Sequence, residues 1–212
     1  RRNRPGPRQR LLASATNLFT TQGIRVIGID RILRDADVAK ASLYSLFGSK
    51  DNLVIAYLEE LDGQYRGRWE ERAARAQGAD AKILAFFDMA IEEEPAKDFR
   101  GSPFLNAANE YPRPETESEE RIVATCVAHR RWMHDTITEL LNQKNGYDSA
   151  GLTDQLLIFL DGGLAGARFT QSVAPLATAL LAAIGMIMIG PATTSANGKE
   201  ILFANWGNRV RA

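Results

Sequence analysis

Polar and aromatic side chains gather on one face of the segment 40–47, K-A-S-L-Y-S-L-F. At helical spacing, Leu43 and Phe47 lie on the opposite face and are its apolar anchors. The outward positions hold Lys40, Ala41, Ser42, Tyr44 and Ser45. Ammonium and hydroxyl groups of this kind donate hydrogen bonds to phosphate oxygens and base edges. If a helix presents this face, it has the chemistry to meet a nucleic acid.

Helical periodicity on both sides of this segment predicts the elements that would position it. We expect helices over 8–22, from about Gly28 to 36, and from 50 to 61. Asp37 lies at the turn between the two short helices, where a left-handed conformation is tolerated. Gly48 ends the second short helix, and Ser49 can cap the next one. Two short helices joined by a tight turn form a helix-turn-helix, whose second helix fits the major groove of DNA.

The stretch Ile27 to Leu53, I-G-I-D-R-I-L-R-D-A-D-V-A-K-A-S-L-Y-S-L-F-G-S-K-D-N-L, closely resembles the DNA-binding signature of the tetracycline-repressor (TetR) family of transcriptional regulators. The core of the resemblance is K-x-S-L-Y-x-x-F-x-S-K. It implies a regulator without enzymatic activity whose recognition helix touches phosphates and bases. It also implies that Lys50 meets a phosphate at the start of the following helix. The implied contact residues are Lys40, Ala41, Ser42, Tyr44, Ser45 and Lys50.

Two positions depart from the family pattern. Gly28 stands where the family usually has a Thr or Ser that caps the second helix and contacts phosphate, and Ala39 replaces a usual Ser or Thr cap on the recognition helix. Each loss could cost around 1 kcal/mol of capping, and less for glycine. The resemblance still places Gly28 among the DNA-binding positions, and we expect phosphate contacts to shift to the basic arm. The arm residues named for this role are Arg4 and Arg8, with Arg1, Arg2 and Arg10 beside them.

Charge divides the chain into a basic beginning and an acidic remainder. The first fifty residues hold ten of the 26 Lys and Arg residues and three of the 26 Asp and Glu residues, although the whole chain is formally neutral. Such asymmetry is typical of a nucleic-acid or anionic-surface function carried by one end. A single cysteine, Cys126, fits a reducing cytoplasm. The apolar run 176–190 is too short to cross a bilayer, so we expect a cytoplasmic protein without membrane association.

Beyond Gly63 the pattern stays helical, with no sustained strand-like alternation, so we expect an all-α fold. The expected helices are 65–77, 80–94, 104–109, 118–143, 153–171 and 175–189. The predicted domains are an N-terminal helix-turn-helix domain over 1–52, a ligand-binding and dimerisation domain over 53–190, and an irregular tail over 191–212.

Aromatic and soft side chains are abundant in the second predicted domain. Helices of this kind could enclose a mostly apolar cavity with a few polar groups for orientation, and the ligand would be a small, largely hydrophobic effector. The alternative, that these side chains simply fill a core, stays open for each of them. The candidate residues are Phe86, Phe87, Met89, Phe104, Asn106, Asn109, Thr125, His129, Trp132, Phe159 and Arg168.

Helices 153–171 and 175–189 are expected to pair with their copies in a second subunit as a four-helix bundle. Glycine in a helix interior costs up to about 1 kcal/mol against alanine, so a glycine cluster indicates close packing, although a kink is an alternative. The residues assigned to the dimer interface are Gly162, Gly163, Gly166, Leu180 and Ile184.

No catalytic pattern stands out in the sequence. Cys126 and His129 at i, i+3 could bind a metal, but no further cluster completes a tetrahedral set, and we expect neither metal nor cofactor. The expected function is a repressor that binds a palindromic operator as a homodimer and is released by its effector. Two alternatives remain: an all-helical small-molecule-binding or hydrolytic protein with a vestigial DNA-binding end, and association of the arginine arm with anionic membranes.

Overall fold

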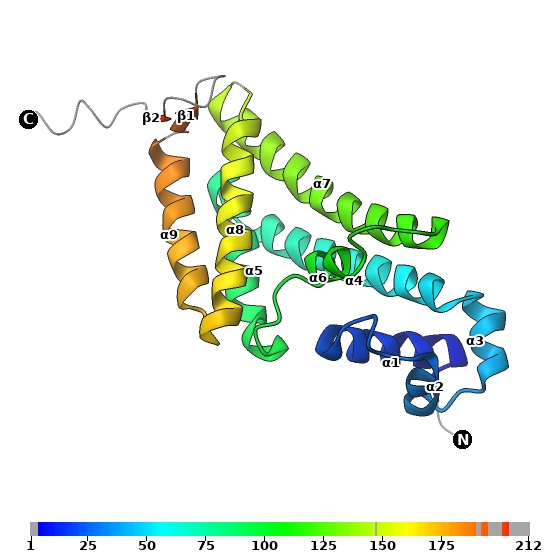
Figure 1. The fold of residues 1–212 in the computed structure, drawn as a ribbon. Coiled ribbons are helices and arrows are strands. Elements are labelled where there is room, and N and C mark those ends of the chain that lie inside the picture. The colour runs from blue at the N-terminus through cyan, green and yellow to red at the C-terminus, as the bar shows by residue number, and fades with distance from the viewer. Residues whose placement is uncertain (1–3, 147, 190–191, 195–200, 204–212) are drawn as a thin grey trace, which may run out of the picture. The chain divides into compact units, whose positions relative to one another are not determined.

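The computed structural model describes residues 4–146, 148–189, 192–194 and 201–203, and within these ranges the chain is helical apart from one two-stranded ribbon (Figure 1). This agrees with the expected all-α class. No helix in these ranges is both long enough and apolar enough to span a bilayer. The elements are α1 Pro7–Gln22, α2 Ile29–Ala36, α3 Lys40–Phe47, α4 Lys50–Arg75, α5 Gly78–Glu93, the 3-10 turn η1 Pro95–Lys97, α6 Pro103–Glu110, α7 Glu117–Asn145, α8 Ala150–Thr170, α9 Ala174–Ile189, β1 Ala192–Thr194 and β2 Ile201–Phe203.

The chain packs into two compact units, each described by itself. The first comprises Arg1–Arg68 and Arg100–Arg131, and the second comprises Trp69–Phe99 and Trp132–Ala212. Helices α4 and α7 each contribute to both units. The predicted boundary after residue 52 divides the chain by expected function and stays a prediction, whereas the packing places α6 and the first half of α7 with the helix-turn-helix.

The first unit is built around the apolar faces of α1 to α4, which the sequence periodicity anticipates. Leu11, Ile32, Leu43 and Leu53 are completely buried, and Phe47 is 8% exposed. Burial of each such side chain contributes about 1.5–3 kcal/mol relative to leaving it exposed. Leu43 and Phe47 therefore anchor α3 as predicted, and α3 cannot turn about its axis without exposing them.

The turns of the helix-turn-helix follow the residues that allow them. Asp37 ends α2 in the left-handed conformation at φ 49°, and Gly48 ends α3 at φ 77°, with its N–H donating to the carbonyl of Tyr44. Ser49 Oγ accepts the backbone N–H of Asn52 at 3.0 Å, so the predicted cap of α4 is confirmed.

In the second unit, α8 lies beside α9 (Figure 1), and two glycines let the helices approach closely. A Cβ at Gly163 would come within 3.0 Å of Ala179 and Leu176, and one at Gly166 would come within 2.7 Å of Pro175. Helix α8 runs unbroken through both positions, so the glycines do not end the helix. The close approach is between two helices of the same chain.

Two expectations about local structure were wrong. Separate helices were expected over 50–61 and 65–77, but α4 continues as one helix from Lys50 to Arg75. The tail was expected to be irregular, but Ala192–Thr194 pairs antiparallel with Ile201–Phe203. Its β-branched and aromatic residues favour strands, and the run is too short for periodicity to reveal. The rest of the tail, Trp206 included, lies outside the described residues.

Candidate nucleic-acid interface

Helix α3 presents the polar face that its sequence predicts. Lys40, Ala41, Tyr44 and Ser45 are exposed and Ser42 is partly exposed. Lys40 Nζ lies 4.0 Å from Asp30 Oδ1, a loose surface pair that leaves the ammonium free to move. Leu46, which was not among the candidates, is 42% exposed on the same helix. The structure thus brings the predicted recognition residues together on one helix surface.

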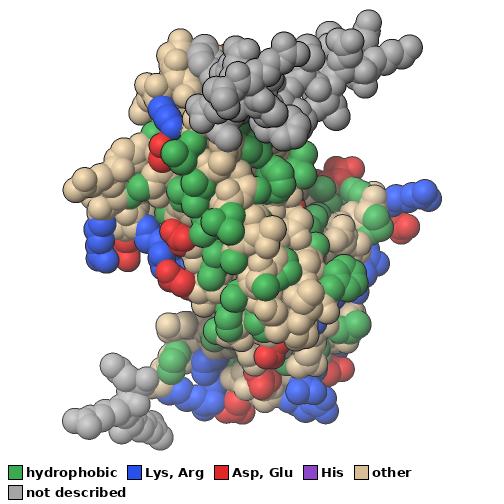
Figure 2. Space-filling view, turned by 90° about the vertical axis from the view of Figure 1, so that its left-hand side faces the viewer, with side chains coloured by type: hydrophobic (Ala, Val, Ile, Leu, Met, Phe, Trp, Pro, Cys, Tyr) green, Lys and Arg blue, Asp and Glu red, His purple; other side chains and the backbone are tan. Residues whose placement is uncertain are grey.

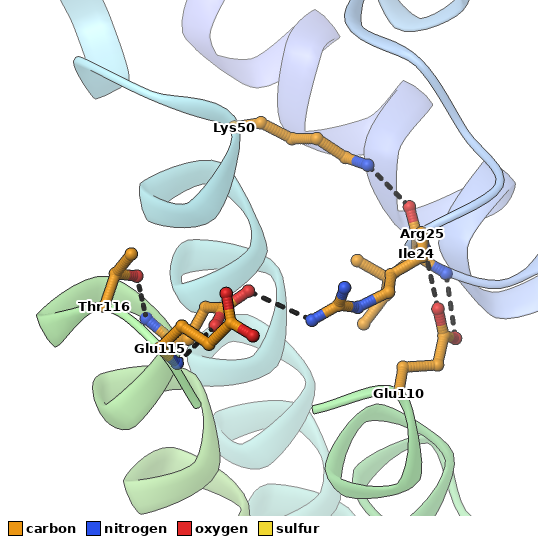
Figure 3. Close-up of polar contacts among 7 residues, drawn as sticks. Ile24, Arg25, Lys50, Glu110, Glu115 and Thr116 are labelled. Carbon is orange, nitrogen blue, oxygen red and sulfur yellow. Dashed lines mark hydrogen bonds and ion pairs between the residues drawn. The ribbon is translucent and has the colours of Figure 1, made fainter. Parts of the chain in front are cut away.

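The side chain of Lys50 points toward the loop between α1 and α2, whereas the family resemblance implies that it contacts a phosphate. Its Nζ donates a hydrogen bond to the carbonyl oxygen of Ile24 at 2.7 Å (Figure 3) and lies 5.9 Å from the centre of the Phe19 ring. Partial burial lowers the pKa of Lys50, and the nearby Asp51 and Glu110 carboxylates oppose that shift. In this structure the ammonium of Lys50 holds the loop between α1 and α2.

The arm at the start of the chain is tied to the helix-turn-helix turn. Arg4 pairs with the Asp37 carboxylate, and Arg10 Nη1 donates to the Asp37 carbonyl at 2.9 Å. The hydrogen bond and charge of Arg4 hold the pKa of Asp37 below its usual value. Arg8 stands 5.3 Å from the centre of the Phe47 ring. Arg4 and Arg10 therefore lie at the α2–α3 turn, whereas Arg8 lies beside the end of α3. Arg8 and Arg10 belong to helix α1 and not to an arm that precedes it, and Arg1 and Arg2 lie outside the described residues.

Gly28 begins α2 in an extended conformation, with φ −78° and ψ 154°. Its carbonyl accepts the N–H of Arg31 at 3.1 Å. Within the described part of the chain, no atom lies within 4 Å of a Cβ built at this position, so a larger residue would fit. Gly28 and Ala39 have no side chain that could cap their helices. The first N–H groups of α2 and α3 therefore lack the side-chain cap that the family pattern supplies.

Two arginines on α2 were not among the predicted DNA-binding residues. Arg31 and Arg34 are exposed and, with Asp35, line an open hollow of about 350 Å³. The first helix of a helix-turn-helix crosses the DNA backbone, where exposed guanidinium groups can pair with phosphates. Their i, i+3 spacing opposite the buried Ile32 and Leu33 is the signal that could have found them.

The candidate ligand residues are divided between the two compact units. In the first unit, the rings of Phe104 and His129 stack with centroids 3.7 Å apart, and His129 Nδ1 lies 2.7 Å from Asp62 Oδ1. Asn106 Nδ2 donates to the carbonyl of Arg100 at 2.9 Å. Asn109 is exposed. Thr125 donates to the carbonyl of Arg121 on its own helix and, with Asp62, lines an open hollow of about 440 Å³.

In the second unit, Phe86 and Trp132 contact one another at 5.8 Å between centroids. Trp69, a residue the sequence reasoning missed, stacks on Phe86 at 5.1 Å and meets Trp132 edge-on at 5.8 Å. Phe87 and Met89 are each 1% exposed. Phe159 and Arg168 are exposed on α8. The structure therefore gathers part of the predicted set into an aromatic cluster, while the buried members fill the core.

The residues assigned to a dimer interface differ in their surroundings. Gly163 and Gly166 face α9 of the same chain, as described above, so packing within one subunit already accounts for them. Gly162 is exposed, and Leu180 and Ile184 are partly exposed. Among the five assigned residues, these three and the partly exposed Gly166 present surface that another subunit could cover, whereas Gly163 is buried.

The described residues show neither a metal-binding cluster nor a reactive thiol. Within the described ranges, no three His, Cys, Asp or Glu side chains are placed to hold a metal ion together. Burial raises the pKa of the Cys126 thiol to about 11. A thiol with so high a pKa is a weak nucleophile and a weak metal ligand at neutral pH.

Comparison with known proteins places this arrangement in a family. Residues 11–57 match the sequence profile of bacterial regulatory proteins of the tetR family. The HTH-type transcriptional repressor NemR of Escherichia coli K12 is 30% identical over 87 residues, which are 41% of this chain and 44% of NemR. The transcriptional regulator LmrA of Bacillus subtilis is 27% identical over 127 residues, 59% of this chain and 66% of LmrA. The sequence matches therefore span less than half of NemR and about two thirds of LmrA.

Solved structures extend the likeness over most of the chain. E. coli NemR in its reduced form has a TM-score of 0.72 at 21% identity, covering 85% of this chain and 96% of its own, which is a likeness of fold. SCO4454, a TetR-family transcriptional regulator from Streptomyces coelicolor, has a TM-score of 0.77 at 34% identity, and the match covers 86% of this chain and 94% of SCO4454. With that identity maintained over nearly the whole of a known member, and with the helix-turn-helix in place, the chain belongs to the TetR family of transcriptional regulators.

Proposed function

We propose that this protein is a repressor that binds a palindromic operator as a homodimer and is released by a small, largely hydrophobic effector. TetR-family proteins are regulators rather than enzymes, and this chain is one of them. The observation that carries the proposal is the exposed face of α3, where Lys40 and Tyr44 stand opposite the buried Leu43 and Phe47. Repression is favoured because NemR, which is similar over 87 residues, is a transcriptional repressor.

DNA binding would use three sources of positive charge and hydrogen-bond donors. Helix α3 would enter the major groove and set Lys40, Ser42, Tyr44 and Ser45 against bases and phosphates. Arg31 and Arg34 of α2 would pair with the backbone, and the arm would follow the adjacent groove. Lys50 would support this surface indirectly, through its hydrogen bond to the loop before α2.

Dimer formation is supported by an apolar stripe along α8 and α9. Positions 158, 162, 165 and 169 share one face of α8, and positions 177, 181, 184 and 188 share one face of α9. Figure 2 looks onto the side where these helices lie, and hydrophobic side chains gather there while charged ones lie toward the margins. The large exposed members are Ile158, Phe169, Leu181 and Met188. A two-fold partner would cover this stripe with its own copy and set two α3 helices at a fixed spacing.

The effector is proposed to be hydrophobic because of the aromatic cluster in the second unit. Trp69, Phe86 and Trp132 offer one stacked and two edge-on ring contacts to one another. A flat apolar ligand could replace some of these contacts with similar ones of its own. Such a ligand would act only if it bound the released spacing of the dimer more tightly than the DNA-bound spacing.

DNA binding by recognition-helix variants tests the proposal. Lys40→Ala and Tyr44→Ala should each weaken binding to the promoter region of the chain's own gene by about tenfold, and Lys40→Ala should also lower the salt slope by about 1. The assay is fluorescence anisotropy at several salt concentrations. Arg113→Ala, which removes an exposed cation between α6 and α7, is the matched control and should bind like wild type.

The alternative of a vestigial DNA-binding end predicts a different outcome. In that case wild type and both α3 variants would bind every tested promoter equally weakly. The uncapped starts of α2 and α3 at Gly28 and Ala39 are the features that favour this alternative.

A further inference from the structure

The loop between α1 and α2 is held by a carboxylate from a distant part of the sequence. Glu110 is the last residue of α6, and its two carboxylate oxygens accept the backbone N–H groups of Ile24 at 2.9 Å and Arg25 at 2.6 Å (Figure 3). Hydrogen bonds to a charged acceptor are about twice as strong as neutral ones. One side chain therefore fixes two consecutive peptide groups of the loop that leads into the helix-turn-helix.

Two other helices, α7 and α4, also contact the same loop. The Arg25 guanidinium lies 4.6 Å from the centre of the Tyr111 ring, and its Nη2 donates to Glu119 Oε1 of α7 at 3.0 Å. On the other side, Lys50 of α4 donates to the Ile24 carbonyl. Ile24 itself is 2% exposed. The loop is thus held through both its backbone and its side chains.

Gly23 makes room for this arrangement. It has φ 101°, a conformation that L side chains rarely adopt, and a Cβ there would lie 3.1 Å from Glu110 Oε1. The carboxylate consequently approaches the backbone at the point where α1 ends. Only three residues separate Arg25, the second residue held, from the start of α2 at Ile29, so the position of the loop limits the direction in which α2 leaves it.

We propose that Glu110 is a positioning residue for DNA binding: it sets the path of the α1–α2 loop and thereby the placement of α2 and α3 as they meet the duplex. This role rests on the proposed function in DNA binding. Glu110 touches no nucleic acid in this role and acts through the loop.

Charge and positioning make opposite predictions for this residue. Removing an acidic group from a protein that binds a polyanion should strengthen binding if only the overall field mattered. If Glu110 positions the loop, the same change should weaken binding, because the two amides lose their acceptor and the loop becomes free to adopt other paths.

Two variants separate the length of the side chain from its charge. Glu110→Asp keeps the charge but is one methylene shorter and cannot reach both amides. Glu110→Gln keeps the length but has one acceptor oxygen and no charge. Glu120→Gln, which removes an exposed carboxylate from the first turn of α7, is the matched control for charge alone.

The readouts are DNA affinity by anisotropy and amide hydrogen exchange by NMR, both on the full chain. We expect Glu110→Asp and Glu110→Gln to bind the operator about tenfold more weakly with an unchanged salt slope, and the amides of Ile24 and Arg25 to exchange at least about fivefold faster. Glu120→Gln should bind as tightly as wild type or more tightly, with unchanged exchange at those amides.

The outcomes distinguish the positioning role from the proposed function. Glu110 variants that bind as Glu120→Gln does, or that leave exchange at both amides unchanged, overturn the positioning role while DNA binding by wild type stands. A wild-type chain that binds none of the tested DNAs overturns the proposed function and the positioning role together.

Discussion

Burial determines the protonation of His129 more strongly than the carboxylate beside it does. The residue is 5% exposed, and burial lowers the pKa of His129 although the hydrogen bond to Asp62 works in the other direction. Arg66 and Arg130 add to the lowering. Burial alone would raise the pKa of Asp62, but hydrogen bonds from Arg66 and His129 outweigh it and lower the pKa. The ring is therefore neutral at neutral pH, stacked on Phe104.

This neutral histidine predicts a pH dependence of stability. In the unfolded chain His129 takes up a proton near its ordinary pKa of about 6.5, whereas in the folded chain it does so only at lower pH. The free energy of unfolding should therefore fall as pH decreases from about 6.5 toward the folded-state pKa. Urea unfolding at about pH 7.5 and about pH 5.5 measures the fall.

Variants of His129 and His134 test whether His129 causes this pH dependence of stability. His129→Gln should flatten the pH dependence between those conditions, whereas His134→Gln retains His129 and should keep it. A wild-type chain equally stable at both pH values would contradict the account of a neutral buried ring.

Residues of the recognition helix could be predicted from the sequence because their arrangement is local. Eight consecutive residues determine which side of α3 is buried, and Leu43 and Phe47 mark that side. Lys50 and Glu110 could not be predicted in the same way. Their partners lie 26 and 86 residues away at Ile24, and no periodicity relates positions so distant. The implied phosphate contact of Lys50 was inferred from family likeness, and the structure places its ammonium on a backbone carbonyl instead.

At the scale of the elements, α8 can pack closely against α9 because Gly163 and Gly166 have no side chains. Alanine normally improves a helix by up to about 1 kcal/mol over glycine. At Gly166 a Cβ would meet the Pro175 ring at 2.7 Å, and this ring cannot rotate away as a flexible side chain would. Steric conflict should therefore reverse the usual effect.

We expect Gly166→Ala to destabilise the protein by about 1–3 kcal/mol, as overpacked cores do. The matched control is Gly63→Ala in the middle of α4, where no described atom lies within 4 Å of the added Cβ. That change should stabilise by up to about 1 kcal/mol. Equilibrium unfolding in urea measures both, and a stabilising Gly166→Ala would show that the two helices separate without cost.

Helices were the most predictable elements, and their ends the least. The helical spacing of apolar residues predicted α8 and α9 as well as the earlier helices. Two helices were expected on either side of Gly63, but a single glycine lowers helix propensity without ending a helix. The apolar face of α4 is buried on both sides of Gly63, so the helix continues. The grouping of α6 with the helix-turn-helix required knowledge of contacts between distant segments.

At the scale of the whole molecule, the apolar stripe on α8 and α9 predicts the oligomeric state. Leu181 is 70% exposed at the middle of the α9 face. A carboxylate there would be buried without a partner in a dimer, so Leu181→Glu should give a monomer by multi-angle light scattering. Loss of the second half-site contact should weaken binding to a palindromic operator by about 100-fold.

The control for this variant is Val127→Glu, which places the same charge at a 49% exposed apolar position on α7. It should remain a dimer with wild-type affinity. If Leu181→Glu also remained a dimer, the two-fold arrangement through α8 and α9 would be wrong.

The burial of Cys126 has a consequence for the kinds of signal the protein can sense. With a pKa of about 11, the sulfur is ionised in on the order of one molecule in ten thousand at pH 7. Peroxides, quinones and other electrophiles react with thiolates, and this chain has a single cysteine. Oxidation of this thiol is therefore a poor trigger, and a compound that controlled the protein through reversible association would leave the polypeptide chemically unaltered.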